Sequence, residues 1–147
     1  MDEQNKQPED QNKQPFEKWQ MEAFIGANVE YFERKWGGSS DYAGWNWAAF
    51  FLGPSWLIYR KMYAETAIVF AFLFVLPLIP INVGPLLIWV FAIWGNGLYR
   101  RKLIRIVKKL EGVRREEQEA LLAKKGGINP VAAVISMVVL LALVFAF

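Results

Sequence analysis

The sequence contains neither cysteine nor histidine among its 147 residues. These absences exclude disulfide bonds, thiolate nucleophiles, imidazole bases and the usual zinc ligands. The apolar segments also lack any pairing of a nucleophile with a base, any phosphate-binding loop and any cluster of carboxylates. We therefore expect a protein that is not an enzyme, with no catalytic residues, no metal ligands and no cofactor.

Charge is missing from a long internal stretch. Thirty-four residues, Thr66–Tyr99, carry no charged side chain. One helix of this length would extend about 51 Å, whereas the hydrocarbon core of a bilayer is about 30 Å thick. Three prolines interrupt its middle, so the sequence predicts a transmembrane hairpin over residues 64–99, with helices near Ala64–Ile79 and Gly84–Tyr99. The alternative is a buried hairpin of a soluble protein, but this chain is too short to wrap two helices that are apolar all round.

A second charge-free run occupies residues 128–147. Its length matches one span of about 20 residues, which predicts a third, C-terminal transmembrane helix. Basic residues flank the predicted spans on one side only, and by the positive-inside rule this side is cytoplasmic. We expect a multi-pass protein with a cytoplasmic N-terminus and an external C-terminus. The flanking residues are Arg60, Lys61, Arg100, Arg101, Lys102, Lys124 and Lys125.

Residues 45–63 are apolar but are interrupted by Gly53 and Pro54. Pro54 denies a continuous helix one backbone donor. We interpret this segment as an interfacial or re-entrant helix that aromatic side chains such as Trp47 and Trp56 anchor. If the segment did cross the bilayer, the N-terminal tail would lie outside, and the sequence leaves this alternative open.

Residues 100–127 are predicted to form a basic amphipathic helix on the cytoplasmic face. Apolar residues recur at steps of four and three from Tyr99 to Val113, and six of the ten residues Arg100–Lys109 are basic. Such a helix attracts anionic lipids, at about 1 kcal/mol per cation near the surface. A simple topology signal explains the charge equally well, whereas nucleic acid is not expected because interleaved aromatic residues are missing. The candidate headgroup contacts are Arg100, Arg101, Lys102, Arg105, Lys108 and Lys109.

The N-terminal region divides into two parts. Residues 1–15 are polar and repetitive and are expected to form a disordered tail. Residues 16–44 are predicted to form a second amphipathic surface helix and a linker, with an aromatic stripe at helical spacing. We expect this helix to lie against the membrane or against the basic helix. Its candidate partner-docking residues are Phe16, Trp19, Phe24 and Tyr31.

Two polar residues fall inside the predicted hairpin. Glu65 lies just inside its first helix, and an ion pair with Arg60 or Lys61 would explain it. Asn96 lies between two glycines, and we expect it at a helix end, where its amide could satisfy free backbone groups. The glycines could equally allow a close approach of two helices, although no GxxxG spacing is present. Both residues are candidate intramembrane polar sites, because polar groups in lipid are often functional.

The run Asn46–Tyr63, which reads NWAAFFLGPSWLIYRKMY, resembles the hallmark of a family of bacterial membrane proteins, domain of unknown function 2628. Gly95–Tyr99 with the basic residues after it resembles a second signature of that family, and Phe24–Trp36 resembles its leading segment. The resemblance covers roughly residues 24–109. It implies a small protein of the bacterial cytoplasmic (inner) membrane without an established activity.

These observations predict an all-α integral membrane protein with a transmembrane hairpin, a C-terminal transmembrane helix and two amphipathic surface helices. The function expected first is that of a non-catalytic membrane adaptor or regulator, which acts on an unknown membrane or cytoplasmic protein through its cytoplasmic-face helices. The alternatives are a component of an oligomeric transporter or channel and a protein that binds anionic lipids and organises the membrane. A homo-oligomer is possible under each hypothesis.

Overall fold

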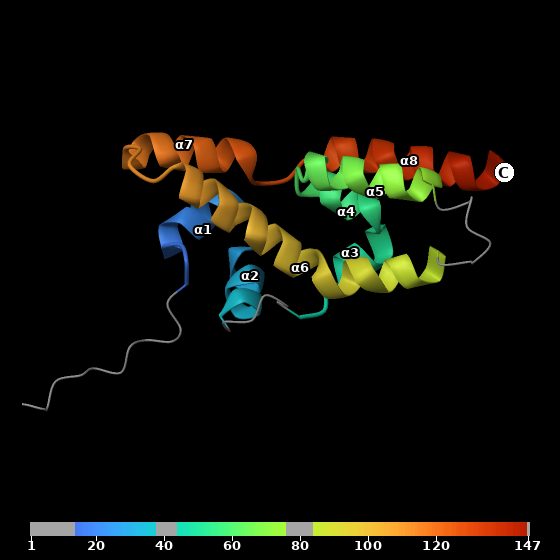
Figure 1. The fold of residues 1–147 in the computed structure, drawn as a ribbon, viewed down its shortest axis with the longest axis horizontal. Helices are drawn as coiled ribbons and strands as arrows, with labels where there is room; N and C mark the ends of the chain where they lie inside the picture. Colours follow the sequence, from blue (N-terminus) through green and yellow to red (C-terminus); the bar gives the residue numbers. More distant parts are fainter. Residues whose placement is uncertain (1–13, 38–43, 76–83, 147) are drawn as a thin grey trace, which may run out of the picture.

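The computed structural model describes residues 14–37, 44–75 and 84–146, and every regular element among them is an α-helix (Figure 1). The predicted all-α class is therefore confirmed. The helices are α1 (Lys18–Ile25), α2 (Val29–Trp36), α3 (Trp47–Leu52), α4 (Pro54–Tyr59), α5 (Tyr63–Val75), α6 (Gly84–Lys109), α7 (Arg115–Lys125) and α8 (Pro130–Ala146).

The N-terminal amphipathic segment forms two helices rather than the single helix that we predicted. Glu17 and Gln20 form a capping box at the start of α1, with the Glu17 N–H 2.8 Å from Oε1 of Gln20. Gly26 ends α1 with a φ of 65°, and Asn28 precedes α2 with a φ of 66°. A right-handed helix cannot continue through residues in these conformations, so the chain turns here.

The predicted interruption at Gly53 and Pro54 is present and separates α3 from α4. Gly53 has a φ of 51°, and Pro54 is the first residue of α4, where its missing N–H costs nothing. The side chain of Asn46 caps α3 by accepting a 2.9 Å hydrogen bond from the N–H of Ala49.

The basic residues after Tyr99 extend α6 instead of starting a helix of their own. α6 is 26 residues long, and its first part belongs to the predicted hairpin. A turn containing Gly112, with a φ of 83°, separates α6 from α7. The prediction of one helix over residues 100–127 is therefore wrong, because Gly112 adopts a left-handed conformation that ends the helical path.

The core joins helices that are distant in sequence. α1 packs against α7, α2 and α3 pack against α6, and α4 packs against α5 and α8. Four aromatic side chains meet at its centre, with ring centroids 4.9 to 5.8 Å apart: Phe24, Phe32, Trp36 and Tyr99. The core therefore uses the aromatic residues of the N-terminal helices.

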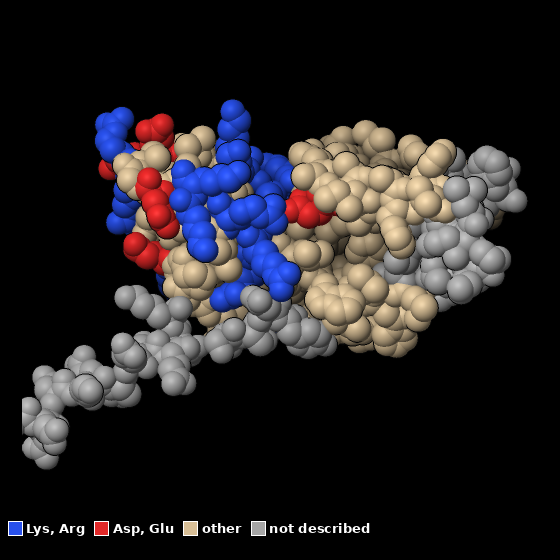
Figure 2. All heavy atoms as spheres, in the orientation of Figure 1, with Lys and Arg blue, Asp and Glu red and all other residues tan. Residues whose placement is uncertain are grey.

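Charged and apolar residues occupy different halves of the molecule. Figure 2 shows lysine, arginine and acidic side chains over one half and an uncharged surface over the other. In Figure 1, α1 and α7 lie at the charged end, and the C-terminal ends of α5 and α8 lie at the opposite end with the start of α6. Large apolar side chains are exposed on this uncharged half, including Phe74 and Phe145, each 86% exposed.

Among the described residues, one helical stretch is long and apolar enough to cross a membrane, Arg115–Ala142. Its apolar window has a mean hydropathy of 1.7 and is only 11% buried. Non-helical residues between α7 and α8 interrupt this stretch, so α8 itself has 17 residues. Tyr63–Phe72 is also apolar but shorter. This stretch is compatible with an association with a membrane.

Several sequence predictions fall on residues that the structure does not describe. They concern most of the tail that is predicted to be disordered (residues 1–13), much of the predicted linker (38–43), the predicted hairpin turn (76–83) and the terminal residue Phe147. Gln14, near the end of the tail predicted over residues 1–15, contacts the folded part: it donates to the carbonyl of Trp36 and accepts a 2.9 Å hydrogen bond from Arg100 Nη2.

Candidate functional site

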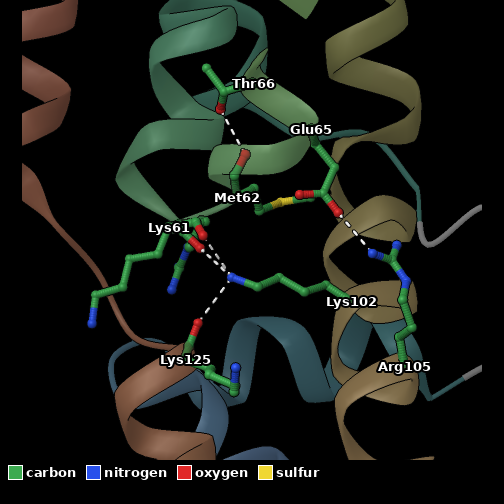
Figure 3. A network of polar contacts seen from close by, with 8 residues as sticks. Lys61, Met62, Glu65, Thr66, Lys102, Arg105 and Lys125 are labelled. Carbon is green, nitrogen blue, oxygen red and sulfur yellow. Dashed lines mark hydrogen bonds and ion pairs between the residues drawn. The ribbon is translucent and has the colours of Figure 1, made fainter. Parts of the chain in front are cut away.

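Lys102 joins three helices at the border between the charged and uncharged halves. Its Nζ donates hydrogen bonds to the backbone carbonyls of Lys61 at 2.8 Å, Lys125 at 3.0 Å and Arg60 at 3.3 Å (Figure 3). Arg60 and Lys61 directly follow α4, and Lys125 ends α7, so these carbonyls lie where helices leave acceptors unsatisfied. A cation at this position also interacts favourably with the negative ends of both helix dipoles.

Burial is the main cause that lowers the pKa of Lys102 to about 8, and the neighbouring cations Lys61, Lys125 and Arg105 act in the same direction. Glu65 acts in the opposite direction and raises it. The Lys102 ammonium therefore begins to lose its proton close to neutral pH, in contrast to an ordinary exposed lysine. An anion bound beside it would favour the protonated form.

Glu65 pairs with a residue other than the ones that we predicted. Its Oε1 lies 3.3 Å from Nη1 of Arg105, which comes from α6 (Figure 3). The predicted partners point elsewhere: Arg60 is buried in the core, and Lys61 Nζ contacts the carbonyl of Lys124 at 3.5 Å. The predicted local ion pair is therefore wrong, because the turn before α5 directs both basic side chains away from Glu65.

These residues line an open cavity of about 520 Å³. Its walls come from the turn after α4, the first turn of α5, the basic part of α6 and the end of α7. Six of its lining residues are basic and one is acidic. The lining residues are Lys61, Tyr63, Ala64, Glu65, Lys102, Arg105, Ile106, Lys109, Leu121, Lys124 and Lys125. We refer to this feature as the basic cavity.

The basic cavity brings together only some of the predicted headgroup contacts. Lys102, Arg105 and Lys109 line it, whereas the other three candidates do not. Arg100 is buried and its guanidinium lies 5.8 Å from the ring of Phe16, while Arg101 and Lys108 are exposed outside the cavity. The remaining cations of the cavity, Lys61, Lys124 and Lys125, carried a sequence signal as flanks of the predicted spans.

The four candidate docking residues contribute to the protein's own packing. Phe16 is 9% exposed and Phe24 is fully buried. Trp19 is half-buried, with the Arg115 guanidinium 4.7 Å from its ring, and half-buried Tyr31 accepts a 3.0 Å hydrogen bond from Asn96. Their docking role stays a prediction, but most of the aromatic surface that suggested it is used inside the molecule.

Asn96 lies within α6 rather than at a helix end, so that part of the prediction is wrong. It is fully buried, and its Oδ1 accepts a 2.8 Å hydrogen bond from Nδ2 of Asn46. The close approach of α3 requires the neighbouring glycine, because a Cβ at Gly95 would lie 3.2 Å from the Cβ of Ala49. Asn96 therefore connects α3 and α6 and has a clear structural role.

The fold and the site define a class: an all-α protein with an uncharged apolar half and a basic cavity at its border. Among the residues that the structure describes, no group of three or more His, Cys, Asp or Glu side chains could hold a metal ion. The chain belongs to the family described as protein of unknown function DUF2628, whose model matches residues 9–105. This match confirms the resemblance found in the sequence. No curated protein and no solved structure matches the chain.

Proposed function

We propose that the chain is a non-catalytic, multi-pass membrane protein that binds the headgroup of an anionic lipid in the basic cavity. The spans would be α5 with the first part of α6, and α8. Their exposed side chains are apolar, which is costly in water and favourable in lipid. Because the apolar parts of these helices are short, the basic cavity would lie near one membrane surface.

The observation that carries the proposal is the position of the basic cavity. Its cations surround the first turn of α5, directly beside the uncharged half of the molecule. A lipid whose acyl chains pack on the apolar helices would place its phosphate beside the first turn of α5. The ammonium group of lysine and the guanidinium group of arginine are strong hydrogen-bond donors to phosphate oxygens. The anionic leaflet that faces the cytoplasm offers such headgroups.

The proposed orientation follows from the distribution of basic residues. The basic cavity and the N-terminal helices would lie in the cytoplasm, and the C-terminus would lie outside. Since the chain lacks cysteine, single cysteines can be labelled with an impermeant thiol reagent in intact cells. We expect labelling after Asn82→Cys and Phe147→Cys, and none after Ser39→Cys or Glu119→Cys. Positions 39, 82 and 147 lie outside the described residues. Labelling at 39 would instead place the N-terminal helices outside.

A lipid-binding role takes precedence over the adaptor role expected from the sequence. The adaptor hypothesis relied on exposed aromatic residues of the N-terminal helices, but Phe16 and Phe24 are core residues. The basic cavity, in contrast, is open and is lined by cations from three separate segments. A regulatory role that depends on the bound lipid is compatible with the same site.

Binding can be tested with the full chain in neutral detergent by native mass spectrometry. Phosphatidylglycerol and phosphatidylcholine with identical acyl chains serve as the probes. The variant Lys109→Gln/Lys124→Gln removes two cations from the basic cavity, and Lys108→Gln/Arg114→Gln removes two exposed cations that do not line it. At about 1 kcal/mol per cation, the cavity variant should bind phosphatidylglycerol about 30-fold more weakly.

The control variant should keep most of the preference for phosphatidylglycerol over phosphatidylcholine. Equal losses in both variants would show that overall charge, and not the basic cavity, attracts the lipid. If the unmodified protein bound both lipids equally, the proposal would be wrong.

A further inference from the structure

Arg60 occupies an unusual position for a cation at the end of a predicted span. Only 4% of its surface is exposed. Its guanidinium carbon lies 4.7 Å from the ring centroid of Phe32, 5.2 Å from that of Tyr99 and 5.4 Å from that of Tyr59. Because an arginine side chain stays charged in proteins, the fold buries a full positive charge inside an aromatic cage.

The cage leaves two nitrogens of the Arg60 guanidinium without hydrogen-bond acceptors. The Nε and Nη1 atoms are buried and have no hydrogen-bond partner among the described residues. No carboxylate in the described part of the chain forms an ion pair with Arg60. Cation–π contacts offset part of the desolvation cost, but they do not replace the hydrogen bonds that the donors lose. A buried guanidinium in this state lacks an anion.

Arg60 lines a second cavity, of about 610 Å³, between α2, α3 and α4. This volume falls within the usual range for small-molecule sites, about 300 to 1,000 Å³. Most of its other walls are aromatic or aliphatic, including Phe32, Trp47, Leu52 and Trp56. One buried cation at an apolar cavity is the arrangement expected for a ligand with one anionic group and an apolar body.

We propose that this cavity, here called the Arg60 cavity, binds a single-chain amphiphile with an anionic head. The head, a carboxylate or a phosphate monoester, accepts hydrogen bonds from Arg60, and the chain lies along Trp47 and Leu52. The surface outside continues this apolar path, because Trp47 is 63% exposed and Phe51 is 75% exposed. A free inorganic anion would leave the apolar walls unused, and a neutral chain would leave Arg60 without a partner.

The Arg60 cavity is distinct from the basic cavity, and the two proposals can fail separately. Arg60 lines the Arg60 cavity but not the basic cavity, and its backbone carbonyl accepts a hydrogen bond from Lys102 of the basic cavity. Phosphatidylglycerol selectivity and binding of a single-chain amphiphile are therefore independent measurements. Lys109→Gln/Lys124→Gln should leave the binding of the single-chain amphiphile unchanged.

The test uses the full chain in phosphatidylcholine nanodiscs and the fluorescent probe 11-(dansylamino)undecanoate, with empty discs as the background. Laurate, dodecyl phosphate and dodecanol are compared as competitors. We expect laurate or dodecyl phosphate to displace the probe at concentrations at least about tenfold lower than dodecanol requires. The reason is that a buried charged hydrogen bond raises affinity about tenfold or more. Whichever anion competes better identifies the head. Equal displacement by dodecanol would overturn the proposal.

Arg60→Met removes the charge and keeps an apolar side chain of similar length. It should weaken probe binding at least about tenfold and raise the melting temperature of the unliganded protein, because an unpaired buried charge is removed. Arg34→Met, at an exposed cation of α2 that does not line the cavity, is the control and should change neither. Unchanged probe binding in Arg60→Met would contradict the proposal.

A purely structural role for Arg60 predicts the opposite pattern, a lower melting temperature with no specific probe binding in either protein. If Arg60→Met does not fold, Ala48→Phe provides the second variant. Ala48 is exposed and lines the cavity, so a phenyl ring there fills space without touching the charge. It should weaken probe binding while the melting temperature stays unchanged, and unaffected binding would overturn the proposal.

Discussion

Replacing Gly126 by alanine should separate α1 from the end of α7, where two of the basic-cavity lysines lie. A Cβ at this position would stand 1.9 Å from the carbonyl oxygen of Phe24 and 2.6 Å from its ring carbon Cδ2. That oxygen cannot move freely, because it accepts a 2.7 Å hydrogen bond from the N–H of Gly127. The Phe24 ring is fully buried against Tyr99, 4.9 Å between centroids.

Relief of the clash requires the end of α1 to move by about 1.5 Å within a close-packed core. Overpacking of this kind costs about 1 to 3 kcal/mol, and the loss of the Gly127 hydrogen bond adds about 1 kcal/mol. We therefore expect Gly126→Ala to reduce the free energy of unfolding by about 3 kcal/mol. At about 3 °C per kcal/mol, the melting temperature should fall by about 10 °C.

Thermal unfolding followed by tryptophan fluorescence in one fixed detergent measures this shift. Gly112→Ala is the matched control, since Gly112 has a φ of 83° but a Cβ added there would meet nothing within 4 Å. Backbone strain alone costs about 1 to 2 kcal/mol, so the control should lose about 3 to 6 °C. If Gly126→Ala melts no lower than Gly112→Ala, α1 does not pack on the segment after α7 as described.

Three further predictions concern the basic cavity and the polar core. The pKa of Lys102 is lowered to about 8 in the folded protein, and a bound anion favours the protonated Lys102 ammonium. The affinity for phosphatidylglycerol should therefore fall as pH rises through about 8. Lys102→Met should abolish this pH dependence. Glu65→Gln removes the one acid lining the basic cavity and should strengthen phosphatidylglycerol binding about fivefold in the native mass spectrometry titration. Asn46→Ala removes the cap of α3 and the bond to Asn96, so thermal unfolding should report a loss of about 2 to 3 kcal/mol; an unchanged melting temperature would show that this polar contact contributes nothing.

Much of the helical layout could be predicted from local features of the sequence. The charge-free run, the Gly53–Pro54 interruption and the apolar stripe after Tyr99 each correspond to an element or a buried face. The break between α1 and α2 also had a local signal, because Gly26 and Asn28 are residues that favour left-handed conformations. The continuation of α6 past Tyr99 had no such local signal, since flexible glycines are compatible with either a break or a close helix contact.

The composition of the two cavities could not be predicted, because it depends on packing between distant segments. Lys61, Lys102 and Lys124 are far apart in sequence and meet only after α4, α6 and α7 have docked. Arg60 looks like an ordinary membrane flank in the sequence. Its burial depends on the rings of Phe32 and Tyr99, which α2 and α6 bring to it.

The position of the lipid headgroup tests the central claim most directly. A phosphatidylglycerol analogue with a diazirine in its headgroup can be incorporated into bilayers with the full chain, irradiated, and mapped by peptide mass spectrometry. We predict crosslinks within residues 61–65, at Lys102, Arg105 and Lys109, and within residues 121–125, with competition by unlabelled phosphatidylglycerol and not by phosphatidylcholine. Crosslinks spread over the exposed basic surface at Lys108 and Arg114, or concentrated on α2, would contradict the basic cavity as the site of binding.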